Sequence, residues 1–178
     1  DLLVTDSGAA ATALASGCKA TSAAVGICAD GKAAKTVLEA AKDKRLRIGL
    51  LTNSTIYDAS PAAFAAHAPD RNQHAAIVEE YLRLEPDLLL GGGRDQFLPQ
   101  GRPGSARKDS REVVALFKSR GYEVVTDKQE LARAATGRIL GLFSLKEMSF
   151  ELDRDKRTEP SVYDMTEAAV RTLEGHQG

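Results

Sequence analysis

The residue pair Asp6–Ser7 joins a short apolar run to a segment of very small residues, in the stretch VTDSGAAATALASG. The apolar run predicts a strand over residues 1–6, and the small residues predict a helix that ends at Gly17. Ser7 would then lie at the carboxyl end of a strand and at a helix N-terminus, where free N–H groups and the helix dipole favour an anion. A simpler role as N-cap remains open, because serine caps helices well.

A second group of reactive side chains lies in YDASPAAFAAHAPDR (57–71), directly after the apolar segment LRIGLLTN. Asp58 and Ser60 offer hard oxygen ligands of the kind that suits Mg²⁺. The planar guanidinium of Arg71 matches the geometry of a phosphate group. An Asp/Ser pair before Pro61 is also a common turn and cap signal. The segment therefore indicates a functional site only in combination with the Asp6–Ser7 segment.

Strand and helix patterns alternate along the rest of the chain and must position these residues. Strands are predicted over 46–53, 87–93, 122–126 and 138–143, with the first of them buried. Helices are predicted over 33–44, 61–67, 72–85, 110–121, 128–135 and 161–175, with an exposed, mobile loop at 99–110. This alternation predicts an α/β fold, a three-layer sandwich with a largely parallel central sheet flanked by helices.

Length and charge exclude several classes of protein. A chain of 178 residues suits a single domain, here residues 1–178. Its formal net charge of -1 gives no support to nucleic-acid binding, which needs a basic patch. No apolar run approaches the roughly 20 residues of a membrane helix, so no membrane partner is expected.

The cysteines and histidines do not form a recognisable zinc motif. Cys18 and Cys28 are ten residues apart, which is not a zinc-ligand spacing. Two separate thiols are the simpler interpretation, and a disulfide, which would imply an oxidising compartment, is the alternative. The three histidines, His67, His74 and His176, are scattered, and we interpret His67 as a structural helix residue.

Four blocks in order resemble the alkaline phosphatase family, and the resemblance covers the whole chain. The blocks are VTDSGAAATALASGCKA, DASPAAFAAHAPDR, LLLGGGRDQFLP, and RILGLFSLKEMSFELDRD followed by EPSVYDMTEAAV. The first block is similar to the family's nucleophile segment, and the second is similar to its magnesium-and-arginine segment.

The resemblance implies a role for each matching residue. Ser7 matches the serine that is transiently phosphorylated and binds zinc, and Arg71 matches the arginine that clamps two phosphate oxygens. Asp6 matches the carboxylate that orients this arginine. Ser60 stands where the family usually has a threonine whose hydroxyl binds Mg²⁺, and Asp58 matches a position that reaches Mg²⁺ through water.

The implied activity is hydrolysis of small phosphate monoesters through a phosphoserine intermediate, at a site of two Zn²⁺ and one Mg²⁺. The resemblance places most of the metal ligands in segments before residue 1 and after residue 178, and neither His67 nor His176 matches a ligand. We therefore expect this chain to be an internal piece of a larger domain, truncated at both ends and inactive in isolation.

The resemblance also implies a periplasmic or secreted location and allows a homodimer, because members of the family are commonly dimers. Two other interpretations remain open. One is a catalytically silent fragment that binds phosphate or serves as an interaction domain, and the other is a related phosphodiesterase or sulfatase. Arg71 in its AHAPDR context, and serine rather than threonine or cysteine at position 7, favour the monoesterase.

Overall fold

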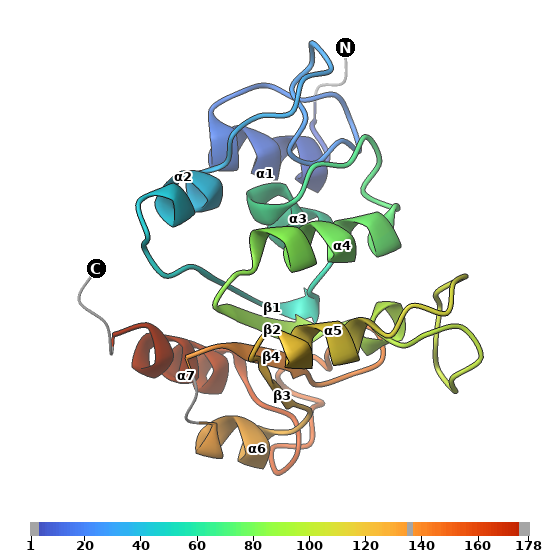
Figure 1. Ribbon diagram of the computed structural model, residues 1–178, viewed down its shortest axis with the longest axis vertical. Coiled ribbons are helices and arrows are strands. Elements are labelled where there is room, and N and C mark those ends of the chain that lie inside the picture. Colours follow the sequence, from blue (N-terminus) through green and yellow to red (C-terminus); the bar gives the residue numbers. More distant parts are fainter. Residues whose placement is uncertain (1–3, 135–136, 175–178) are drawn as a thin grey trace. The chain divides into compact units, whose positions relative to one another are not determined.

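The structure is a computed structural model that describes residues 4–134 and 137–174. Its contacts group the chain into two compact units. Unit 1 comprises residues 1–46 and 57–85, and unit 2 comprises residues 47–56 and 86–178. Figure 1 shows the helices and strands of both units.

Unit 1 is built from four helices with small residues between them. The helices are α1 (Ser7–Ser16), α2 (Val37–Asp43), α3 (Ala59–Ala65) and α4 (His74–Leu84). Helices α1 and α3 pack against each other. Their buried faces consist largely of alanine, at Ala9, Ala11, Ala15, Ala59, Ala62 and Ala63. Alanine favours the helix and lets two backbones approach closely, which explains the unusual composition of both segments.

Unit 2 contains a four-stranded parallel sheet. The strands are β1 (Gly49–Thr55), β2 (Leu88–Gly92), β3 (Glu123–Val125) and β4 (Ile139–Leu142). Their order in the sheet is β1-β2-β4-β3, and every neighbouring pair is parallel. The two central strands, β2 and β4, pair over four residues, from Leu88 opposite Ile139 to Gly91 opposite Leu142. Parallel pairing needs crossover connections, which the intervening helices supply.

Helices flank this sheet. They are the short η1 (Arg94–Gln96), α5 (Val113–Ser119), α6 (Lys128–Arg133) and α7 (Val162–Glu174). Leu131 of α6 and Met165 of α7 join Leu88, Leu90 and Ile139 in one apolar core cluster, so α6 and α7 cover the same face of the sheet. The α/β fold with a parallel sheet is thus confirmed.

Near the N-terminus the predicted strand is wrong for the residues that can be described. Val4 to Asp6 lie outside any strand, and the Val4 side chain is 80% exposed. The rest of that prediction, residues 1–3, lies outside the described residues, as does His176. Ser7 therefore begins its helix after an extended cap, because Asp6 has φ -78° and ψ 167°.

Other predictions needed smaller corrections. Strand β1 begins three residues later than expected and is largely half-buried rather than buried. His67 follows the end of α3 instead of lying in a helix. In the loop 99–110, Arg107 is buried, because its guanidinium pairs with Asp109 and donates to the Gln96 carbonyl.

Candidate functional site

Asp6 organises the N-terminus of α1 and so places Ser7. Its carboxylate accepts hydrogen bonds from the backbone N–H groups of Gly8 and Ala9, each at 3.1 Å. These two donors are among those that a helix leaves unpaired at its start, so Asp6 is the N-cap. Ser7 is the first helical residue, and its side chain is exposed.

Arg71 connects the predicted catalytic residues. One guanidinium nitrogen donates to Ser7 Oγ, and the same nitrogen lies 3.5 Å from Asp6 Oδ2. The other terminal nitrogen donates to Asp58 Oδ1 at 2.6 Å. The side chains of Arg71, Asp6 and Asp58 are 28%, 24% and 38% exposed, so a ligand in solvent can reach all three. Within unit 1 the structure thus brings Ser7, Asp6, Asp58 and Arg71 into one cluster.

The cluster keeps the Asp6 carboxylate charged. Burial alone would raise the pKa of this carboxyl group. Hydrogen bonds from the backbone N–H groups of Ala9, Ala23 and Gly8, together with the nearby guanidinium, outweigh burial. The pKa of Asp6 therefore lies below its ordinary value of 3.8. Because its pKa is lowered, this carboxylate stays ionised to a lower pH than usual and can hold the Arg71 guanidinium in a fixed direction.

Asp58 and Ser60 lie together at the start of α3. Asp58 is the N-cap and accepts a 2.7 Å hydrogen bond from the Ala59 N–H, while the Ser60 side chain is exposed in the first turn. Tyr81 of α4 is fully buried, and its pKa is raised first by burial and then by the negative charge of Asp58. The pairing of Asp58 with Arg71 was not predicted from sequence, because the two residues are brought together only by the fold.

Asp58 and Ser60 place two oxygen donors in one segment. Asp58 and Ser60 supply the carboxylate and hydroxyl oxygens that Mg²⁺ prefers, but the ion takes about six ligands in all. Among the residues that the structure describes, no group of three or more His, Cys, Asp and Glu side chains is placed to hold a metal. These residues therefore fit a shared Mg²⁺ site and do not by themselves make a zinc site.

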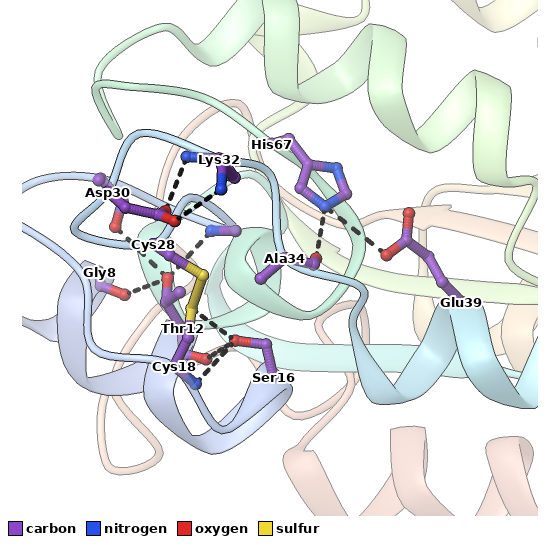
Figure 2. Close-up of a disulfide and its surroundings, with 12 residues drawn as sticks. Gly8, Thr12, Ser16, Cys18, Cys28, Asp30, Lys32, Ala34, Glu39 and His67 are labelled. Atoms are coloured by element: carbon purple, nitrogen blue, oxygen red, sulfur yellow. Dashed lines mark hydrogen bonds and ion pairs between the residues drawn. A yellow bond between two sulfur atoms is a disulfide. The ribbon is translucent and has the colours of Figure 1, made fainter.

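Unit 1 also contains a disulfide, which follows the C-terminal end of α1. Cys18 and Cys28 are bonded, with their Cα atoms 5.6 Å apart, so the interpretation as separate thiols is wrong. Figure 2 shows the bond next to Ser16, whose hydroxyl lies 3.3 Å from Cys18 Sγ. A tight turn follows Cys28, whose N–H donates to the Lys32 carbonyl. Spacing alone could not decide between thiols and a bond.

His67 makes structural contacts, as expected, although outside a helix. Its Nε2 lies 2.8 Å from the Ala34 carbonyl oxygen and 3.6 Å from Glu39, as Figure 2 shows. Its Nδ1 lies 3.7 Å from Glu80. The ring thus ties the segment after α3 to helices α2 and α4.

Fold and cluster together define an α/β protein in which an arginine contacts an exposed serine at a helix N-terminus. A family model for alkaline phosphatase matches residues 1–177. Alkaline phosphatase 3 of Bacillus subtilis is 38% identical over 176 residues, which cover 96% of this chain and 36% of that protein. The chain belongs to the alkaline phosphatase family, a family of metal-dependent phosphomonoesterases.

Solved structures agree with this assignment. The alkaline phosphatase of Thermus thermophilus matches with a TM-score of 0.90 and 36% identity, over 98% of this chain and 36% of that chain. A variant of the alkaline phosphatase from the Antarctic bacterium TAB5, with Mg bound, matches with a TM-score of 0.81 and 28% identity. That match covers 97% of this chain and 47% of the other. The chain thus spans about a third of the length of its Bacillus and Thermus relatives.

Proposed function

We propose that this chain supplies the nucleophile and the phosphate clamp of an enzyme that hydrolyses phosphate monoesters. Ser7 is the nucleophile, Arg71 binds two non-bridging oxygens of the phosphoryl group, and Asp6 orients Arg71. The observation that carries the proposal is the contact of the Arg71 guanidinium with Ser7 Oγ. A phosphoryl group bound by this guanidinium would lie against the hydroxyl that attacks it.

The chain's own residues would work by position and charge. Ser7 lies at the N-terminus of a ten-residue helix, where the helix dipole favours the negative phosphoryl group. The planar fork of Arg71 offers two parallel donors to that group. Asp58 holds one end of the fork and Asp6 lies beside the other, so the fork faces Ser7.

Metal ions belong to the same proposal. Asp58, through water, and Ser60 would contribute to a Mg²⁺ site, and Ser7 would bind Zn²⁺. Bound zinc supplies the charge that activates a serine hydroxyl, which is a poor nucleophile at its free pKa. Mg²⁺ bound to a TAB5 variant supports the magnesium part. Further ligands must come from residues other than those described, since these hold no group of three metal-binding side chains.

The setting of the proposal follows the family. We propose small phosphate monoesters as substrates, residues 1–178 as part of one larger domain, a homodimer, and a periplasmic or secreted location. The Cys18–Cys28 disulfide supports export, because disulfides persist in oxidising compartments. Among residues 4–134 and 137–174, none of the helices has the length and apolar character to cross a membrane.

The experiment is hydrolysis of p-nitrophenyl phosphate by the full-length enzyme, supplied with Zn²⁺ and Mg²⁺, and by its Ser7→Ala variant. We expect the variant to lose at least about a thousandfold in kcat, because removal of a nucleophile leaves only binding and charge stabilisation. Ser119→Ala is the matched control, since the Ser119 hydroxyl is exposed and donates to Leu116 within its own helix. Full activity of Ser7→Ala would contradict the proposal. Binding of phosphate without turnover by the wild type would favour a silent phosphate-binding protein.

A further inference from the structure

Ala23 lies between the two partners of the clamp. Its backbone N–H donates to the Asp6 carboxylate, and its carbonyl oxygen accepts the Arg71 N–H at 2.7 Å. One peptide segment therefore holds both the acid that caps the nucleophile helix and the arginine. Ala23 has φ +68°, a left-handed conformation that is uncommon for alanine. Such a conformation costs free energy and persists when the surrounding structure imposes it.

The residues after Ala23 are fixed by two contacts. Val25 and Ala68 exchange backbone hydrogen bonds of 3.0 and 2.9 Å, which join this loop to the segment that leads to Arg71. Gly26 has φ +64°, and a Cβ there would lie 2.1 Å from the Ala66 carbonyl oxygen. The segment 23–26, which we call the clamp loop, is thus pressed against residues 66–71.

Thr12 provides the connection from the clamp loop back to α1. Its hydroxyl donates to the Gly8 carbonyl at 2.8 Å and accepts the Gly26 N–H at 2.9 Å, and the side chain is fully buried. Figure 2 shows the Thr12 side chain with its bond to Gly8. Threonine has a lower helix propensity than alanine, so its place among alanines is better explained by this contact than by the helix.

We propose that Thr12 is a positioning residue for the clamp, because its hydroxyl fixes the clamp loop, which in turn holds Asp6 and Arg71 beside Ser7. The inference rests on the proposed function of Arg71 as a phosphate clamp. It assigns to Thr12 no contact with substrate. Loss of the hydroxyl would leave the buried Gly26 N–H without its acceptor and would favour movement of the loop.

The test uses the full-length protein with Thr12→Val, which keeps the shape and removes the acceptor, and with Thr12→Ser, which restores it. Thr172→Val is the matched control, because the Thr172 hydroxyl makes the same kind of bond to the carbonyl four residues earlier, at 2.7 Å. Two quantities are measured. They are the Kd of inorganic phosphate by calorimetry and hydrogen exchange of the Val25, Ala68 and Arg71 amides by NMR.

We expect Thr12→Val to weaken phosphate binding roughly tenfold and to speed exchange at these amides, with Thr12→Ser and Thr172→Val near wild type. Unchanged phosphate binding in Thr12→Val would overturn the inference, even if exchange rises, because the loop would then be structural without positioning the clamp. Equal losses in Thr12→Val and Thr12→Ser would also overturn it. If Thr12→Val does not fold, Thr12→Ala removes the same acceptor with a better helix former.

The two proposals can fail separately. A wild type that does not bind phosphate contradicts the clamp, and faster Arg71 exchange in Thr12→Val would then show only a structural link from Thr12 to Arg71. If wild type and Thr12→Val bind phosphate equally tightly, the positioning role of Thr12 is contradicted, while the proposed role of Arg71 in binding phosphate is not.

Discussion

At the scale of single residues, the proposed phosphate clamp depends on the guanidinium of Arg71. Replacing Arg71 by lysine keeps the charge but removes the planar pair of donors that contacts Ser7 and Asp58. We expect Arg71→Lys to raise the Kd of inorganic phosphate by about tenfold or more, as measured by calorimetry. Arg83→Lys is the control, because the Arg83 side chain is 70% exposed and pairs with Glu80 within α4. Equal affinities of Arg71→Lys and Arg83→Lys would count against the clamp.

Asp6 is predicted to stabilise the fold as the N-cap of α1, in addition to its proposed role in orienting Arg71. Asparagine caps helices about as well as aspartate, whereas alanine leaves the Gly8 and Ala9 N–H groups without their acceptor. Asp6→Ala should therefore lower the free energy of unfolding by about 1 kcal/mol more than Asp6→Asn does, as measured by urea titration. Identical losses for the two variants would show that the cap contributes nothing.

Sequence could identify the side chains of the cluster but not the backbone that holds them. Ser7, Asp6, Asp58 and Arg71 were found because their types and order resemble a family motif. Ala23 carries no chemical signal in its side chain, since both of its contacts come from the peptide group. Thr12 is visible in the sequence only as a β-branched residue within an alanine-rich helix. Its contact could not be predicted, because it is made to the Gly26 N–H of a loop that folds back onto the helix.

At the scale of elements, the disulfide stabilises the loop between α1 and α2. It closes a loop with a sequence separation of ten residues. By the chain-entropy model, replacing both Cys18 and Cys28 with serine should lower the free energy of unfolding by about 2–3 kcal/mol. Urea unfolding of the oxidised protein and of the double variant measures this difference. A reductant should destabilise the wild type and leave the variant unaffected, and a wild type indifferent to reductant would contradict the prediction.

Helices α6 and α7 are joined by an ion pair whose contribution depends on pH. Burial raises the pKa of Asp164, but bonds from Lys128 at 2.9 Å and from Ser161 outweigh it and lower the pKa to about 2. A lowered pKa means that the contribution to stability is full above the ordinary value of 3.8 and is lost as the pH falls toward 2. Asp164→Asn should lose this acid sensitivity in unfolding experiments. Parallel pH profiles for variant and wild type would refute the assignment.

Strand and helix types were mostly predictable, whereas their ends and degree of burial were not. Helix α1 ends at Gly17 as expected, because glycine accepts the φ of +75° there. The failed strand before Ser7 shows the limit of an apolar pattern, since Val4 is exposed among the described residues. Burial of a short apolar run depends on partner strands that may come from anywhere in a chain, so local sequence cannot fix it.

At the scale of the whole molecule, the proposal gives this chain one part of a catalytic site. The described residues bring Ser7 and Arg71, the proposed nucleophile and phosphate clamp, together in unit 1 but hold no group of three metal-binding side chains. We expect a protein limited to these 178 residues to show no Ser7-dependent turnover of p-nitrophenyl phosphate with Zn²⁺ and Mg²⁺. Adding a chain that covers the remaining two-thirds of a relative should restore turnover. Ser7-dependent activity of the 178 residues alone would refute this prediction.

The central claim is that Ser7 takes the phosphoryl group while Arg71 holds it. The most direct measurement is mass spectrometry of the Ser7 peptide after acid quenching of the full-length enzyme during turnover of a phosphate monoester. We predict a phosphoryl group on Ser7 in the wild type. In Ser7→Ala we expect both this phosphoryl group and the activity to be lost. Turnover with an unmodified Ser7 peptide, or with the phosphoryl group on another residue, would contradict the claim.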